Sequence, residues 1–180
     1  MSKYPIIIFE GIEASGKTTN FKIAANYLKK RRKSFIKLRE PGGSIFSEKI
    51  RKLILDKKSN FKKKTDLLLY LAARSENIDT LIKNFRKKII LLDRFSDSTI
   101  AYQHFGMGVN LDIIKKINNH ILKSFKVDFT FLSIVSTNNM QKRLKQRKKL
   151  NRYDEFKDCL LYTSDAADDM QCVDLGGRRI

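Results

Sequence analysis

The sequence predicts an α/β fold in which a doubly wound parallel β-sheet is covered by helices on both faces. Three observations indicate this class: short continuous apolar segments recur, helical segments separate them, and a glycine-rich turn joins the first apolar segment to the first helix. Continuous apolar strands are typical of parallel sheets buried on both faces. Because right-handed crossovers connect such strands, we expect their carboxyl ends, and the functional site, at one edge of the sheet.

The predicted elements follow from the apolar pattern and from the turn residues that bound each segment. Strands are expected at residues 6–9, 34–38, 88–92 and 127–135. Helices are expected at residues 17–32, 47–56, 65–85, 96–103, 111–124 and 138–149. No internal repeat or low-complexity linker divides the chain, so residues 1–158 are expected to form one domain.

Composition excludes several classes of protein. The 180 residues are 42% hydrophobic and include two Cys and two His, which is too few for a disulfide-rich scaffold or a multi-cysteine zinc site. The first apolar run is too short for a signal peptide or a membrane span, so we expect a cytoplasmic protein without membrane contact. The charge of +19 is compatible with nucleic-acid binding. Because AT-rich codons also enrich Lys, Ile and Asn, we expect no nucleic-acid partner.

The composition changes at residue 159. Residues 159–180 contain no Lys and no Asn, although both are frequent before this point. Written back as codons, residues 159–168 and 173–180 resemble two parts of an adaptor used in short-read sequencing libraries, in one frame and at the right spacing. We therefore expect residues 159–180 to be a non-native tail, with a native loop and strand as the alternative.

The strongest motif is the G-x-x-x-x-G-K-T pattern from Gly11 to Thr18, between the first strand and the first helix. This is a P-loop, whose backbone N–H groups surround a phosphate chain at the helix N-terminus. Lys17 is expected to contact the β- and γ-phosphates, and Thr18 to hold Mg²⁺. The expected ATP-binding residues of the loop are Gly11, Ile12, Glu13, Ala14, Ser15, Gly16, Lys17, Thr18 and Thr19.

Three further motifs narrow the choice of second substrate: LREPGGS at residues 38–44, LYLAAR at residues 69–74 and DRFSDSTIAYQ at residues 93–103. With the P-loop, they make the chain similar to the bacterial-type thymidylate kinases, in the family's order and spacing. The resemblance implies a P-loop nucleoside-monophosphate kinase-like fold and a homodimer. It also implies an ATP:dTMP phosphotransferase that makes dTDP with ATP and Mg²⁺ by in-line phosphoryl transfer.

The resemblance also implies roles in phosphoryl transfer. Glu13 would lie near the sugar 3′-hydroxyl and the metal, Asp93 would join Thr18 in holding Mg²⁺, and Arg94 would bridge the donor and acceptor phosphates. Read from chemistry alone, Glu13 could be a solvated loop acid, and Asp93 and Arg94 a structural ion pair.

For the acceptor dTMP, the resemblance implies that Arg39 binds the phosphate and that Tyr70 stacks on thymine, with Arg74 donating to the base edge. Tyr70 could instead be a core aromatic. Tyr102 would pack under the sugar, where a ribose would place its 2′-hydroxyl. The residues implied to line the base pocket are Ser98, Thr99 and Gln103.

The basic segment after the fourth strand resembles the family's lid, at about residues 138–153. Here the P-loop contains no arginine, and the resemblance implies that lid arginines supply that charge: Arg143 toward ATP, with Arg147 and Arg152 in catalysis. By composition alone, this segment could equally be a solvated or RNA-binding helix.

Two alternatives to a dTMP kinase remain open from the residues. One is a kinase for another deoxynucleoside monophosphate, and the other is a basic P-loop ATPase that binds nucleic acid. In the family, the lid is followed by a further helix, a last strand, an adenine-contacting loop and a closing helix. None of these is recognisable after Asp158, so we expect an incomplete sheet.

Overall fold

A computed structural model of the chain describes residues 4–122, 125–147 and 153. Its elements follow in the order β1 (Ile6–Gly11), α1 (Lys17–Lys30), β2 (Phe35–Arg39), α2 (Ile45–Leu55), α3 (Lys63–Asn84), β3 (Ile89–Asp93), α4 (Ser96–Thr99), η1 (Ile100–Gly106), α5 (Leu111–Leu122), β4 (Phe129–Ser133) and α6 (Thr137–Lys145). The non-native tail predicted at residues 159–180, and lid residues 148–152, lie outside the described residues.

The four strands form one parallel sheet in the order β2-β3-β1-β4, which confirms the predicted fold class. The register pairs Phe9 of β1 with Asp93 of β3, and Arg39 of β2 with the same Asp93. Because all the strands run in one direction, their carboxyl ends meet at a single edge, as the sequence predicts. The P-loop begins at this edge.

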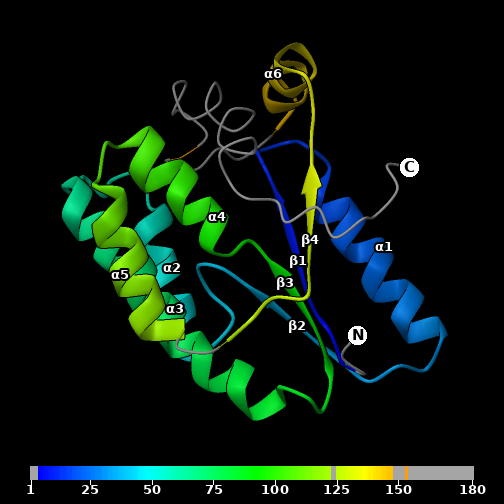
Figure 1. Cartoon of the computed structure of the whole chain (residues 1–180). Helices are drawn as coiled ribbons and strands as arrows, with labels where there is room; N and C mark the ends of the chain where they lie inside the picture. Colours follow the sequence, from blue (N-terminus) through cyan, green and yellow to red (C-terminus); the bar gives the residue numbers. More distant parts are fainter. Residues whose placement is uncertain (1–3, 123–124, 148–152, 154–180) are drawn as a thin grey trace.

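Helices lie on both faces of the sheet (Figure 1). Alternate side chains of the central strands pack against these helices. On one face, Phe9 and Leu91 pack with Ala25 of α1. On the other, Ile8 and Leu92 pack with residues of α3 such as Leu81. The near-continuous apolar sequence of β1 and β3 follows from this burial on both faces.

The strand predicted at residues 127–135 is shorter and more exposed than expected. The pairing of β4 with β1 ends at Ser133 opposite Gly11, where β1 turns into the P-loop. As the last strand in the sheet order, β4 pairs only with β1 among the described strands. Phe131 is 56% exposed, although its ring stacks on Phe9 with centroids 5.5 Å apart. The expectation that each strand is covered on both faces is therefore wrong for β4.

The helix predicted at residues 96–103 is in fact two helical segments. The short α4 continues into η1, a π-helix that extends to Gly106. A π-helical turn widens the backbone by one residue and is common at functional sites. Here it accompanies the burial of two neighbouring side chains, Tyr102 and Gln103.

The other helices begin and end within about two residues of their predicted bounds, except α6, which ends at Lys145 instead of continuing to residue 149. No helix in the described part of the chain is both long and apolar enough to cross a membrane.

Candidate active site

The P-loop connects β1 to α1 and has the backbone that its glycines predict. Gly11 has φ +145°, and a Cβ there would lie 2.6 Å from the carbonyl oxygen of Ser133, so only glycine fits. Gly16, also at positive φ, precedes the first residue of α1 and makes no side-chain cap. The N–H groups of the first helical turn are therefore directed at the loop, where they can bind an anion. Ala14 has φ 57°, which costs a non-glycine residue about 1–2 kcal/mol.

Lys17 and Asp93 form an ion pair at the floor of the loop. The Nζ of Lys17 donates to Asp93 Oδ1, and the Lys17 side chain is largely buried. Burial lowers the pKa of Lys17, and nearby Arg94 lowers it further, while Asp93 opposes both effects. The adjacency of β1 and β3 thus brings together the lysine expected to bind phosphate and the carboxylate expected to hold the metal.

The donor set near this pair fits Mg²⁺. Mg²⁺ prefers oxygen ligands and is usually held by one or two protein groups together with substrate phosphates. Asp93 offers a partly exposed carboxylate, and Thr18 offers an exposed hydroxyl at the start of α1. Within the described residues, no group of three or more His, Cys, Asp or Glu side chains could hold an ion without such phosphates.

Glu13, Arg94 and Tyr102 form a second group beside the loop. Arg94 Nη2 donates to Glu13 Oε1 at 2.6 Å, and Tyr102 donates its hydroxyl proton to Glu13 Oε2. The guanidinium of Arg94 also lies over the Tyr102 ring, 5.3 Å from its centroid. Burial disfavours the charge on Arg94, but Glu13 and other nearby groups outweigh this effect and raise its pKa. Three residues predicted separately are therefore in direct contact.

Glu10 supports this group and is absent from the sequence-based site. Its carboxylate is buried and accepts from the N–H of Phe95 at 2.6 Å and from the hydroxyl of Ser98 at 2.5 Å. Ser98 Oγ in turn accepts from Arg94 Nη1 at 3.0 Å. Ser98, predicted to line the base pocket, thus lies between Glu10 and Arg94. The sequence feature that could have indicated Glu10 is a carboxylate at the end of a continuous apolar strand.

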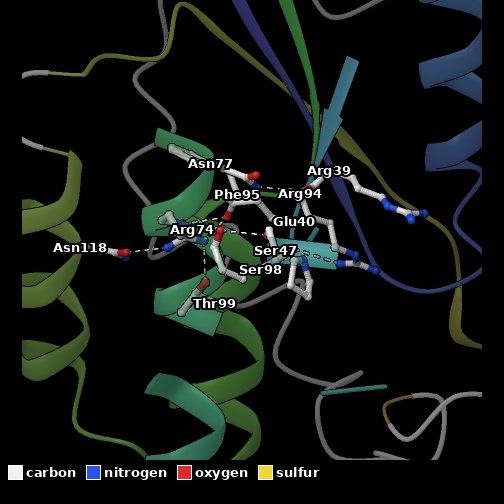
Figure 2. Close-up of polar contacts among 12 residues, drawn as sticks. Arg39, Glu40, Ser47, Arg74, Asn77, Arg94, Phe95, Ser98, Thr99 and Asn118 are labelled. Atoms are coloured by element: carbon white, nitrogen blue, oxygen red, sulfur yellow. Dashed lines mark hydrogen bonds and ion pairs between the residues drawn. The ribbon is translucent and has the colours of Figure 1, made fainter. Parts of the chain in front are cut away.

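Arg74 lies in a buried polar cluster (Figure 2). Its Nε and Nη2 donate to Glu40 Oε2 at 2.8 and 2.6 Å. Nη2 also donates to Thr99 Oγ1 at 2.8 Å, and Nη1 donates to Asn118 Oδ1 at 2.5 Å. The guanidinium lies 5.0 Å from the centroid of the Phe95 ring. The glutamate of the REPGG turn therefore holds the arginine expected at the base edge, a pairing that the sequence did not predict.

Three tyrosines gather next to this cluster. The Tyr153 ring is edge-on to Tyr70, at 5.8 Å between centroids, and to Tyr102, at 5.5 Å. Burial raises the pKa of Tyr70 to about 12. Gln103, the last predicted pocket residue, is fully buried and donates to Asp66 of α3. Tyr153 and Asp66 were not among the predicted site residues.

Arg39 pairs with Glu48 of α2. Its Nε and Nη2 donate to the two carboxylate oxygens at 2.9 and 2.7 Å, and this hydrogen-bonded pairing raises the pKa of Arg39. Figure 2 shows its side chain extending away from Arg74. The predicted phosphate-binding arginine is therefore neutralised by a partner, and a bound phosphate would have to compete with Glu48.

Arg51 is a candidate phosphate-binding residue that the sequence-based site omits. Its Nη1 donates to the carbonyl oxygen of Pro41 in the REPGG turn at 2.6 Å, and it pairs with no carboxylate among the described residues. Burial lowers the pKa of Arg51, and Arg39 nearby lowers it further. The sequence feature that could have indicated Arg51 is its helical spacing from Ser47 on α2. Ser47 accepts a hydrogen bond from the N–H of Gly42 in the REPGG turn.

The basic helix α6 reaches the P-loop. Arg143 Nη1 donates to the carbonyl oxygen of Ala14 at 2.9 Å, which brings this predicted ATP-site residue to the loop. Arg147 is exposed beyond the end of the helix. Arg152, the third predicted lid arginine, lies outside the described residues.

Comparison with known proteins decides the family. The model of the thymidylate kinase family matches residues 9–166, which is most of the chain. The chain belongs to the thymidylate kinase family. Thymidylate kinase of Thermosipho africanus (strain TCF52B) is 38% identical over 151 residues, covering 83% of this chain and 75% of the relative. That of Mesoplasma florum is 40% identical over 153 residues, covering 83% and 72%.

A solved structure supports the same assignment. The crystal structure of thymidylate kinase from Ehrlichia chaffeensis superposes with a TM-score of 0.68 at 35% sequence identity, and the match covers 79% of this chain and 78% of that one. In this chain, the carboxyl edge of the sheet holds two groups: the P-loop with Lys17 and Asp93, and the cluster around Arg94. The hydrogen bond from Arg94 to Glu13 of the P-loop connects them.

Proposed function

We propose that this chain is a dTMP kinase, which transfers the γ-phosphoryl group of ATP to dTMP and releases ADP and dTDP. A phosphate oxygen of dTMP forms the new bond to the γ-phosphorus while the bond to the β-phosphate oxygen breaks. The acceptor oxygen is already ionised, so no strong general base is required. The observation that carries the proposal is the contact between Arg94 and Glu13 of the P-loop, because it supports a cation shared between the proposed acceptor and donor phosphate sites.

The proposed donor site is the P-loop. The N–H groups of the first turn of α1 would bind the phosphate chain, and Lys17 would leave Asp93 for the β- and γ-phosphates. Thr18 and Asp93 would hold Mg²⁺, which, when bound, neutralises charge on the phosphates. Arg143 on α6 adds positive charge over the loop. We propose a lid at about residues 138–153, within a domain of residues 1–158.

The proposed phosphate site for dTMP lies among three arginines. Arg94 is held by Glu13 and Ser98 and can stabilise negative charge as the phosphoryl group moves. Arg51 has no carboxylate partner among the described residues, whereas Arg39 is paired with Glu48. We therefore assign the acceptor phosphate to Arg94 and Arg51, with Arg39 joining after release from Glu48.

The proposed sugar and base sites use the tyrosine cluster and the polar residues beside it. Tyr102, fixed by Glu13, would occupy the space that a 2′-hydroxyl requires, and Tyr70 would stack on thymine. Thr99 and Gln103 lie on the segment that faces Arg74 and Asp66. Arginine offers only donors, which suits the O4 acceptor of thymine.

Measuring ADP release tests this function. The chain is incubated with ATP and Mg²⁺ alone, and then with dTMP, dUMP, dCMP or single-stranded DNA. We expect release that depends on dTMP. Release driven by dCMP instead would identify another deoxynucleoside monophosphate kinase, and release driven only by DNA would identify a nucleic-acid-dependent ATPase.

The assembly state and location are also proposals. Exposed apolar side chains on α2 and α3, including Ile45, Phe46 and Leu68, supply a surface that a homodimer could bury. Light scattering coupled to gel filtration would give the mass, and a monomer at all concentrations would contradict the homodimer. We place the enzyme in the cytoplasm, where a reaction that consumes ATP and a free nucleotide has its substrates.

A further inference from the structure

The inference concerns the orientation of the Gln103 side chain. Asp66, Tyr70 and Arg74 are spaced four residues apart on α3, so they share one face of that helix. Two hydrogen bonds connect this face to the segment formed by α4 and η1. Arg74 Nη2 donates to Thr99 Oγ1 at 2.8 Å, and Gln103 Nε2 donates to Asp66 Oδ1 at 3.1 Å. Tyr70 lies on α3 between Asp66 and Arg74, the two residues that make these hydrogen bonds.

A carboxylate determines which end of an amide faces it. Gln103 Nε2 donates to Asp66 Oδ1, so the NH₂ group of Gln103 faces the carboxyl group and its Oε1 is directed elsewhere. Oε1 is buried and has no hydrogen-bond partner in the structure. A buried acceptor without a partner is unfavourable, and a ligand that donates to it would recover this loss.

Asp66 is itself held in place. It is 1% exposed, and the Tyr153 hydroxyl lies 2.9 Å from Oδ1 and 2.8 Å from Oδ2, so the phenol donates to the carboxylate. Tyr153 also contacts the rings of Tyr70 and Tyr102. The carboxylate of Asp66 therefore accepts from Gln103 of η1 and from Tyr153, which follows α6 in the chain.

We propose that Asp66 is a positioning residue that fixes Gln103 Oε1 as the hydrogen-bond acceptor for the N3–H of the acceptor base, with Tyr153 holding Asp66 in place. The proposal rests on the proposed function and assigns to it a determinant of base selectivity. Thymine and uracil carry a proton on N3, whereas cytosine has a lone pair there. With Gln103 Oε1 fixed toward the base, the lone pair on N3 of cytosine would face another acceptor, and no hydrogen bond could form between them.

Replacing Asp66 by Asn tests the proposal. An Asn side chain can offer either an NH₂ group or a carbonyl oxygen, so Gln103 becomes free to turn its amide. We expect the ratio of kcat/KM for dTMP to that for dCMP to fall about tenfold or more, mainly through KM. Titration calorimetry with each monophosphate in the absence of ATP should show the same change in the ratio of Kd values.

Three controls accompany this variant. Asp79→Asn removes an exposed carboxylate from the same helix and should leave the ratio unchanged. Asp66→Glu keeps the carboxylate and should preserve much of the selectivity. Tyr153→Phe keeps the ring but removes the donor to Asp66, and should lower the ratio in the same direction; it decides the question if Asp66→Asn does not fold.

The outcomes separate this proposal from the proposed function. A wild-type chain that neither binds nor phosphorylates dTMP rejects the proposed function, and the positioning role with it. A wild-type chain that prefers dTMP, together with an Asp66→Asn variant that weakens dTMP and dCMP equally, leaves the function standing and overturns the positioning role. In that case Asp66 would serve only to hold α3 against η1.

Discussion

Arg94 is the residue to which we assign the largest part in the proposed phosphoryl transfer. It contacts Glu13, Ser98 and the face of Tyr102, and none of these contacts requires a ligand. The guanidinium of Arg94, the proposed acceptor-side cation, is thus oriented before any nucleotide binds. Such preorganised charge contributes most where charge moves in the transition state.

Replacing Arg94 by Lys therefore tests geometry at constant charge. A lysine ammonium cannot donate to both Glu13 and Ser98 in the planar arrangement of a guanidinium. We expect kcat with dTMP to fall by about a thousandfold, the scale of a transition-state arginine. Steady-state kinetics measures this loss, and the exposed Arg86→Lys serves as the control. An Arg94→Lys enzyme within threefold of wild type would contradict the assigned role.

Asp97 gives the protein a pH-dependent stability. Burial raises its pKa to about 6, and neighbouring Glu10 adds to the rise. The folded state therefore holds the proton more tightly than the unfolded state does, so this group's contribution is complete below pH 3.8 and is lost as pH rises through about 6. Asp97→Asn removes this loss.

We expect the Asp97→Asn variant to gain stability relative to wild type between pH 4 and pH 6, because Asp97 ionises near pH 3.8 in the unfolded chain and near pH 6 in the folded one. Urea unfolding of both proteins at intervals of half a pH unit measures the difference, and other titrating groups cancel in it. A difference that stays constant across this interval would show that Asp97 has an ordinary pKa.

At the scale of elements, the central and edge strands differ in what they contribute to stability. Leu92 of β3 is fully buried between α3 and its neighbouring strands, whereas Phe131 of β4 is 56% exposed. Leu92→Ala should lower the free energy of unfolding by about 2–5 kcal/mol. Phe131→Ala should lower it by about 1 kcal/mol or less. Chemical denaturation measures both, and equal losses would contradict the burial assigned to β4.

We propose that helix α6 contributes separately to ATP binding. Arg143 donates to Ala14 in the P-loop, whereas Lys145 on the same helix is exposed. Arg143→Ala should raise the KM for ATP about tenfold with little change in the KM for dTMP, because only the donor site loses a charge. Lys145→Ala should change neither constant. A KM for ATP unchanged in Arg143→Ala would remove α6 from the donor site.

The elements also show what could be predicted from sequence. β1, β2 and β3 lie within two residues of their predicted bounds, because a continuous apolar run identifies a strand buried on both faces. β4 also lies within two residues of its predicted bounds, but the burial expected of it is wrong, since apolar composition does not reveal what covers a strand. The π-helix η1 was also missed, because its residues have no propensity that separates them from an α-helix.

Across the whole molecule, four of the site residues that were missed share one property. Glu10, Glu40, Asn118 and Asp66 act through partners 34 to 88 positions away in the chain. Motifs report residues that contact a ligand, whereas such partners are defined only by the folded chain. Glu40 is part of the REPGG motif, but its contact with Arg74 forms only when the REPGG turn packs against α3.

The charge of the whole molecule is compatible with two kinds of ligand, a polyanion and a nucleotide. The excess of 38 basic over 19 acidic residues is compatible with a polyanion partner. However, several basic groups at the strand edge already have defined partners: Lys17 on Asp93, Arg74 on Glu40 and Arg94 on Glu13. These pairs give the edge a specific arrangement of partnered cations that a general basic surface would not need.

The most direct measurement of the central claim is product formation from labelled ATP. The chain is incubated with Mg²⁺, dTMP and ATP labelled at the γ-phosphate, and the nucleotides are separated. We predict that the label appears in dTDP, that dCMP accepts far less, and that Lys17→Met abolishes the transfer. Label released only as inorganic phosphate, at a rate independent of dTMP, would contradict the assignment of this chain as a dTMP kinase.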